Sequence, residues 1–186
     1  MAKNRLSKER WKAWEERRRL ILSADFCLSG TSEHKEARIR EARKDYAYFV
    51  ETYFPHLCTN KETKGIIRCG KFQIDAAKYL KAHRHTRAVF EWARGHAKST
   101  HVSLMIPIWL MIQEERTINV MLLVSKSEDS ADRLLSDLQC ELEFNTLLRS
   151  DFNIRIDEGN WSTGEFKTTD GMLFMALGRG QSPRGI

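Results

Sequence analysis

Residues 88–100, AVFEWARGHAKST, govern how the rest of the chain is interpreted. The first five residues are apolar and partly β-branched or aromatic, which predicts a buried strand. Residues 93–97, ARGHA, are mostly small residues around one glycine and predict a tight turn. From Lys98 onward, apolar residues recur every three or four positions, which predicts a helix. The order strand, small-residue loop, Lys-Ser and helix is the context in which a phosphate-binding loop is expected.

Such a loop suits a polyphosphate for physical reasons. The first amides of a helix lack intrahelical partners and lie at the positive end of its dipole, and a loop folded over them directs several N–H groups toward one anion. Lys98 would add a positive charge at the β- and γ-phosphates, and the Ser99 hydroxyl would bind the accompanying Mg²⁺. The standard pattern has glycine at the positions of Trp92 and Ala97. The spacing alone therefore leaves open a plain strand–turn–helix with a solvated lysine.

Four stretches together resemble the large terminase subunits of tailed bacteriophages, which are DNA-packaging ATPases. Residues 94–99, RGHAKS, resemble the family's variant Walker A loop, in which an arginine lies in the loop and an alanine precedes the lysine. Residues 46–57, YAYFVETYFPHL, resemble the aromatic segment ahead of the ATPase core. Phe72-Gln73 resembles the adenine-contacting motif, and residues 178–185, GRGQSPRG, resemble the loop before the Walker B strand. The four matches occur in the family's order.

The resemblance implies an α/β fold of the P-loop NTPase type, with a mainly parallel sheet flanked by helices, a β-hairpin and a helical N-terminal arm. It implies a basic helical arm or subdomain over residues 1–60 and an incomplete ATPase core over residues 61–186. The residues themselves predict the order βαβα, because a second apolar run at residues 118–124 precedes a long amphipathic segment. Asp170-Gly171 lies between two apolar runs and predicts a hairpin with a type I′ turn.

The resemblance also implies roles for single residues. Lys98 and Arg94 would act on the phosphates, and Arg184 would act across a subunit boundary, with Arg179 as the competing candidate. Phe72 would pack on adenine and Gln73 would pair with its polar edge, since an amide offers both a donor and an acceptor. A surface glutamine beside a core phenylalanine is the alternative. ATP and Mg²⁺ are the implied cofactors, with Ser99 as the metal ligand. The implied nucleotide-binding set is Phe72, Gln73, Arg94, Gly95, His96, Ala97, Lys98, Ser99 and Thr100.

Hydrolysis requires acidic residues that the resemblance does not supply here. In the family, an Asp that holds Mg²⁺ and a Glu that activates water follow the Arg-Gly loop. No apolar run ending in Asp-Glu follows Gly185, and Asp129, Asp132 and Asp137 are predicted to lie on a helix. We therefore expect an N-terminal piece of a longer ATPase that lacks Walker B and the nuclease domain. By itself it should bind nucleotide weakly and hydrolyse it little or not at all.

Composition narrows the class of protein. A charged fraction of 30% and a hydrophobic fraction of 41% are typical of a folded domain. No apolar run is long enough to span a membrane. The four cysteines lack C-x-x-C spacing, which argues against a zinc site and for free thiols in a reducing cytosol. The net charge of +6 includes a basic excess in residues 1–22. That excess favours polyanions, although a solvated helix with internal ion pairs explains the same pattern.

Three more helices are predicted. Residues 4–22 form a charged helix, in which Trp11 and Trp14 would stack on bases, dock on a partner helix or pack into the domain. Residues 33–54 carry an aromatic stripe at helical spacing that is expected to be core, and residues 71–82 form the third helix. In the helix that starts at Lys98, Pro107 lies well inside and predicts a kink or break near residues 103–106.

The sequence is thus interpreted as the N-terminal ATPase part of a viral or prophage packaging motor that drives double-stranded DNA into a capsid. By resemblance, its partners are double-stranded DNA, the portal protein and the small terminase subunit, and the full-length protein forms a homo-oligomeric ring. No membrane is involved, and the compartment is the cytoplasm of an infected or lysogenic bacterial host. Two alternatives stay open. One is another P-loop helicase or translocase, and the other is a non-catalytic nucleic-acid-binding module with a degenerate nucleotide site.

Overall fold

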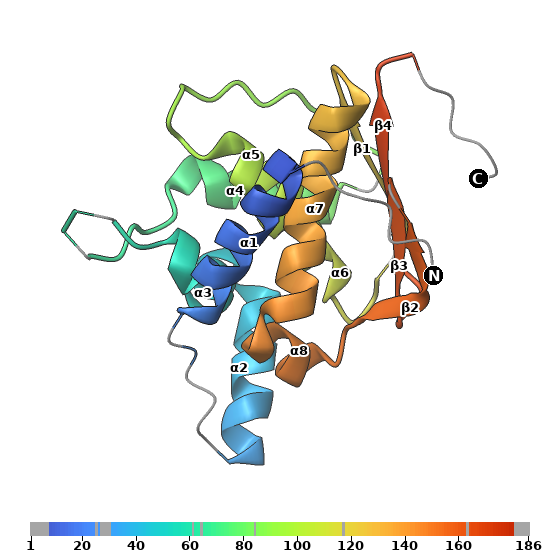
Figure 1. Cartoon of the computed structure of the whole chain (residues 1–186). Coiled ribbons are helices and arrows are strands. Elements are labelled where there is room, and N and C mark those ends of the chain that lie inside the picture. Colours follow the sequence, from blue (N-terminus) through green and yellow to red (C-terminus); the bar gives the residue numbers. More distant parts are fainter. Residues whose placement is uncertain are drawn as a thin grey trace. The chain divides into compact units, whose positions relative to one another are not determined.

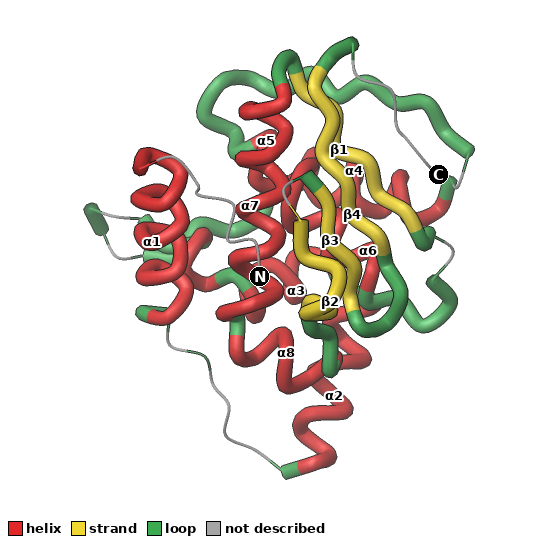
Figure 2. Tube along the Cα trace, turned by 45° about the vertical axis from the view of Figure 1, so that its right-hand side comes forward, coloured by secondary structure: helices red, strands yellow, loops and turns green. Residues whose placement is uncertain are grey.

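In a computed structural model of the chain, the described residues form helices and one four-stranded sheet, so the fold is α/β as predicted (Figures 1 and 2). The chain divides into two compact units. The first comprises Met1–Ser23, Ile118–Arg149 and Asn153–Ile186, and the second comprises Ala24–Thr117 and Ser150–Phe152. The boundary at residue 60 between a helical arm and an ATPase core stays a prediction. The structure describes residues 8–24, 26, 31–60, 62–63, 65–83, 85–116, 118–162 and 164–180.

The sheet of the first unit is mixed. Its strand order is β1 (Val120–Ser125), β4 (Leu173–Gly178), β3 (Glu165–Thr168) and β2 (Ile156–Ser162). β1 and β4 are parallel, whereas the other two pairings are antiparallel. The apolar run at residues 118–124 does form a strand, but the described sheet is not mainly parallel as expected. The reason is that β3 joins β4 through a tight hairpin, and a tight turn can join only antiparallel strands.

β3 and β4 form the hairpin that Asp170-Gly171 predicts, but the predicted turn type is wrong. The Gly171 N–H donates to the Thr168 carbonyl oxygen at 2.9 Å, and the Thr168 N–H donates to the Met172 carbonyl oxygen at 2.9 Å. Gly171 has a φ of 89°, whereas Asp170 does not have a positive φ. A type I′ turn requires positive φ at both central residues, so the loop instead places only its glycine in the left-handed region.

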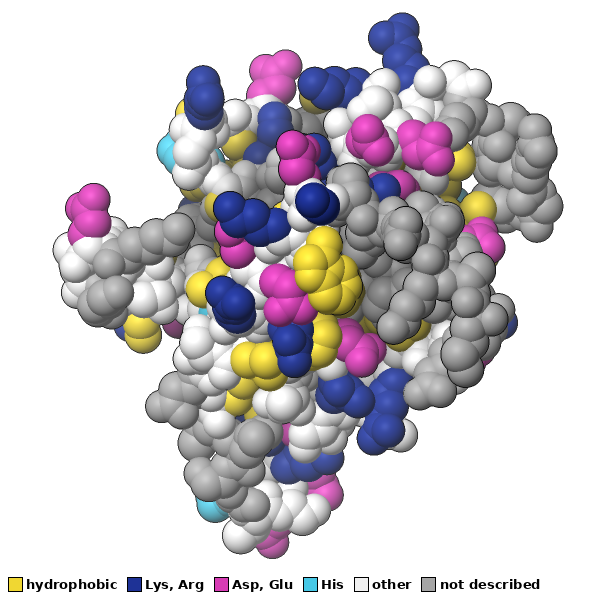
Figure 3. Space-filling model, viewed as in Figure 1, with side chains coloured by type: hydrophobic (Ala, Val, Ile, Leu, Met, Phe, Trp, Pro, Cys, Tyr) yellow, Lys and Arg dark blue, Asp and Glu magenta, His cyan; other side chains and the backbone are white. Residues whose placement is uncertain are grey.

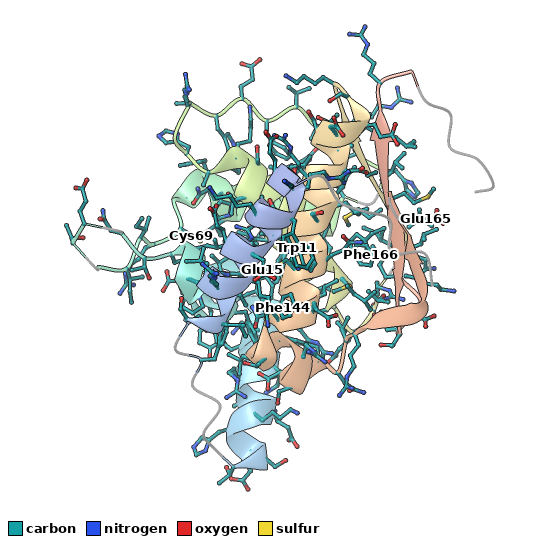
Figure 4. All side chains as sticks on the ribbon, viewed as in Figure 1. Trp11, Glu15, Cys69, Phe144, Glu165 and Phe166 are labelled. Carbon is teal, nitrogen blue, oxygen red and sulfur yellow. The ribbon has the colours of Figure 1, made fainter. Side chains whose placement is uncertain are left out.

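One helix covers this sheet and a second helix packs on the first. α7 (Glu128–Phe144) contacts β4 and β1, and α1 (Lys8–Leu22) lies alongside α7 (Figure 1). Glu165 and Phe166 follow one another in β3 and lie on opposite faces of the sheet (Figure 4). Phe166 is fully buried, and its ring stacks on Phe174 with the centroids 4.8 Å apart. Of the predicted apolar stripe of α7, Leu134 is half-buried, and the other members are buried: Ala131, Leu135, Leu138 and Leu142.

In the second unit, the residues predicted to form one helix over 33–54 form two. α2 (Ser32–Lys44) and α3 (Tyr46–Tyr53) are separated by Asp45. The Asp45 N–H closes the last turn of α2, and its carboxylate accepts from the Tyr48 N–H at 3.0 Å. Aspartate favours such caps because its side chain competes for backbone groups. The core stripe is confirmed, since these residues are each at most 1% exposed: Ala42, Tyr46, Phe49, Val50 and Tyr53.

The helix after the loop changes its hydrogen bonding where proline predicts a break. α5 (Lys98–Thr100) continues into a π-helical turn at His101–Met105 and then into α6 (Ile106–Met111). Pro107 has no N–H, and its ring clashes with the carbonyl four residues earlier, so a wider turn accommodates it. The remaining helices are α4 (Lys71–Ala82), which matches the predicted range, a 3₁₀ turn at Pro55–Leu57, and α8 (Thr146–Phe152). None of the described helices combines the length and apolarity needed to cross a membrane.

Candidate phosphate-binding loop

The segment ahead of the loop is not the buried strand that was expected. Residues 88–92 have irregular backbone, and Val89 is 86% exposed. All the strands of the described sheet belong to the first unit. The second unit has, among its described residues, only an isolated bridge between Thr59 and Ile66. β-branched and aromatic residues favour a strand only where a partner strand can take their backbone hydrogen bonds.

The loop backbone alternates in handedness. Gly95 has a φ of 89° and Ala97 a φ of 53°, whereas His96 between them does not have a positive φ. This alternation turns successive N–H groups toward one side and forms a concave anion-binding nest. The His96 N–H donates to the Ala93 carbonyl oxygen at 3.3 Å, and the Ala97 carbonyl oxygen accepts from the His101 N–H at 3.0 Å. The loop therefore runs directly into the first helical turn, whose amides lack intrahelical partners.

Two exposed cationic side chains flank this nest. Arg94 and Lys98 are exposed, and neither side chain forms a hydrogen bond or an ion pair with another described residue. The Ser99 hydroxyl is also exposed, and Thr100 is half-buried. Concave backbone donors beside two free cations suit a polyanion, because charge-assisted hydrogen bonds are stronger than neutral ones. The set also fits Mg²⁺, since a hydroxyl oxygen at the start of the helix is of the type that this ion accepts.

Gln73 contacts the loop directly. Its Nε2 donates to the His96 carbonyl oxygen at 3.0 Å, and its Oε1 accepts from the Gly70 N–H at 2.8 Å. These two bonds fix the orientation of the amide and leave one donor and one acceptor unused. The adenine contact that the resemblance implies for Gln73 stays a prediction. The bond to His96 had no signal in the sequence, because it joins residues 23 positions apart.

Aromatic rings lie next to this contact. The ring of Phe72, which is 41% exposed, lies 5.1 Å from Trp92 and 5.3 Å from His96 between centroids. Trp92 in turn lies 6.1 Å from His101, whose Nδ1 is 2.8 Å from the Tyr46 hydroxyl. The sequence predicts Trp92 as the last residue of a strand and as a departure from the glycine pattern, and it does not single out His101. The signal that was available is the occurrence of large rings on both sides of the loop.

The contact between Tyr46 and His101 joins two neutral groups. Burial lowers the pKa of His101 to about 4, below its ordinary value of 6.5. Burial also raises the pKa of Tyr46 far above its ordinary range. Both side chains are therefore uncharged at neutral pH, and this packing adds no charge to the positive field of Arg94 and Lys98.

The other predicted catalytic arginines lie in a different part of the chain. Arg184 lies outside the described residues. Arg179 belongs to the first unit, where it follows β4 and is exposed. Its backbone N–H donates to the Ser125 carbonyl oxygen at 2.9 Å and so links the ends of β4 and β1. A catalytic role for either arginine stays a prediction.

The basic helix α1 uses part of its charge inside its own unit. Arg10 Nη2 lies 2.9 Å from Asp132 Oδ2, and Arg17 Nη2 lies 3.4 Å from Asp137 Oδ2. Both acidic partners belong to α7. Acidic and basic side chains are intermixed over α1 in the space-filling view and do not form one basic patch (Figure 3). For these two arginines, the structure thus shows the ion pairs that were the alternative to binding a polyanion.

The two tryptophans of α1 differ in their surroundings. The Trp14 ring meets Phe144 of α7 edge-on, with the centroids 5.9 Å apart. Trp11 is 55% exposed and lies on α1 near Glu15 (Figure 4). Trp14 therefore packs into its unit, and Trp11 remains available for a partner.

No model of a known protein family matches this chain, and no curated protein matches it. The resemblance to terminases therefore rests on the four sequence stretches.

Proposed function

We propose that the chain is the nucleotide-binding part of a viral or prophage DNA-packaging ATPase, a large terminase subunit with a P-loop NTPase-like fold. The observation that carries the proposal is the loop at residues 93–100. There, the positive φ values of Gly95 and Ala97 form a nest beside the exposed side chains of Arg94 and Lys98. Magnesium-bound ATP is the ligand class that this set of donors and cations fits best.

Each group of the loop would contact a different part of the nucleotide. The N–H groups at the start of the helix would donate hydrogen bonds to the phosphate oxygens, and Lys98 would neutralise the β- and γ-phosphates as a point charge. The Ser99 hydroxyl would hold Mg²⁺, which neutralises phosphate charge when it is bound. Arg94 would reach the terminal phosphate. For this chain we expect weak nucleotide binding with little or no hydrolysis.

The wider function is proposed from the resemblance. The full-length protein would form a homo-oligomeric ring in the cytoplasm of the bacterial host. It would use ATP to move double-stranded DNA through the portal protein into a capsid, with the small subunit as a further partner. The exposed Trp11 and the cations of α1 that are not paired with α7 are the described groups that favour a nucleic-acid partner.

The test is a calorimetric titration of the chain with ATP in the presence of Mg²⁺. Lys98→Ala should weaken binding about tenfold or more, since a charge-assisted hydrogen bond contributes about 1.5–3 kcal/mol. Lys78→Ala is the matched control, because Lys78 is an exposed lysine in the same unit. It should leave affinity within about twofold. Binding that ignores Lys98, or no binding at all, would favour the non-catalytic module.

A further inference from the structure

Gln73 holds a backbone group whose direction determines what the loop presents. The His96 carbonyl oxygen accepts the bond from Gln73 Nε2 at 3.0 Å. In a trans peptide the C=O and the following N–H point in opposite directions, and the described chain contains no cis peptide. By holding the His96 carbonyl toward α4, Gln73 therefore turns the Ala97 N–H away from α4. That N–H is one of the nest donors and has no partner among the described residues.

The amide of Gln73 is itself held in place. Its Oε1 accepts from the Gly70 N–H at 2.8 Å, so a 180° rotation of the amide would lose this bond as well as the bond to His96. The side chain is 8% exposed, which leaves little water to replace a lost bond. The neighbouring Phe72 packs its ring against His96, with the centroids 5.3 Å apart. Two successive residues of α4 thus fix the same residue of the loop.

We infer that Gln73 is a positioning residue for the phosphate loop. It sets the peptide between His96 and Ala97 so that the Ala97 amide faces the anion, whatever group the phosphates carry. The inference rests on the proposed function, because it assigns Gln73 to the same anion site. It differs from the adenine contact implied by the resemblance, in which Gln73 would read the base and leave phosphate binding unchanged.

The two roles are separated by comparing ATP with inorganic tripolyphosphate, which has no base. Gln73→Met removes both amide bonds and keeps the length and neutrality of the side chain. It should weaken the binding of both ligands by a similar factor of about fivefold. This is the effect expected when one hydrogen bond to the anion is lost, here that of the Ala97 N–H. Weaker ATP binding with unchanged tripolyphosphate binding would overturn the inference. Gln113→Met is the control, because Gln113 Nε2 also donates to a backbone carbonyl, that of Trp109 at 2.8 Å, and not to the loop.

A second readout needs no ligand. Backbone ¹⁵N relaxation should show lower order parameters at His96 and Ala97 in Gln73→Met than in the wild-type chain, with the helix content by circular dichroism unchanged. Unchanged order parameters would overturn the inference. If the wild-type chain binds neither ATP nor tripolyphosphate, the proposed function fails, and the relaxation data still decide whether Gln73 orders the loop.

Discussion

The Tyr46 hydroxyl lies 2.8 Å from Nδ1 of His101, and both side chains are buried. Tyr46 opens α3, whereas His101 lies one turn after Ala97 in the helix that follows the loop. The contact therefore ties the aromatic core of the second unit to the helix that carries the candidate site. The neutral state of His101 is part of this arrangement, because a buried charge without a partner is unfavourable.

We predict that acidification destabilises the second unit through His101. The unfolded residue binds a proton below about pH 6.5, whereas burial lowers the pKa in the folded chain to about 4. The stability is therefore complete above pH 6.5 and is lost as the pH falls toward 4. Between pH 7.5 and pH 5 the loss should be about 2 kcal/mol. Urea unfolding of the wild-type chain and of His101→Gln at both pH values measures it.

The free energy of unfolding of His101→Gln should depend less on pH than that of the wild-type chain. His85→Gln is the control, since His85 is an exposed histidine in the same unit. Parallel pH profiles for the wild-type chain and His101→Gln would contradict the assignment.

A second prediction concerns the left-handed conformation of Ala97. A β-branched side chain at a φ of 53° clashes with the backbone and costs about 1–2 kcal/mol more than glycine. Ala97→Val should therefore weaken binding of Mg²⁺ and ATP about tenfold, because the loop leaves the nest conformation. Ala97→Gly should retain wild-type affinity within about threefold. Equal affinities for the valine and glycine variants, measured by calorimetry, would show that the backbone of Ala97 does not matter.

A third prediction concerns the buried carboxylate of Asp151. It accepts two bonds from Arg38, at 2.6 Å and 2.8 Å, and one from the Tyr53 hydroxyl at 2.7 Å. Asp151→Asn should lower the free energy of unfolding by about 3 kcal/mol, because Arg38 loses the charge that compensates its desolvation. Asp75→Asn breaks an exposed pair with Lys71 and should cost less than about 0.5 kcal/mol. Chemical denaturation measures both, and similar losses would refute the prediction.

The two tryptophans of α1 give a fourth prediction. Trp14→Ala should destabilise the first unit by about 2 kcal/mol, because it removes the edge-on contact with Phe144. Trp11→Ala should change stability by less than about 0.5 kcal/mol, since its ring is mostly exposed. If Trp11 stacks on unpaired bases, that variant should weaken binding to single-stranded DNA more than binding to double-stranded DNA in a fluorescence anisotropy titration. A stability loss as large as that of Trp14→Ala would place Trp11 in the packed interface.

Local patterns predicted much of the fold. The range of α4 follows from the spacing of its apolar residues, and the hairpin follows from Asp170-Gly171 between two apolar runs. The change of hydrogen bonding before Pro107 follows from its missing N–H. These features depend on residues within a few positions of one another. Two local features were still missed, namely the caps at Asp45 and the turn type at Gly171, because several backbone geometries satisfy the same residues.

Features that depend on distant residues could not be predicted in this way. Residues 88–92 have the composition of a strand, but the described residues of their unit supply no partner strand. The candidate site depends on distant residues in the same way. The sequence predicts that Arg94, Gly95 and Lys98 belong to the loop. It does not predict the hydrogen bond from Gln73 to the loop, because that bond joins α4 to a residue 23 positions along the chain.

The sequence by itself determined the range of α4, the position of the hairpin and which residues belong to the loop, because propensity and spacing act over short distances. Only the tertiary structure decided the pairing of β1 with β4, the burial of His101 and the direction of the His96 carbonyl. Each of these depends on which distant backbone or side-chain group takes up a hydrogen bond or excludes water. No local pattern encodes that choice.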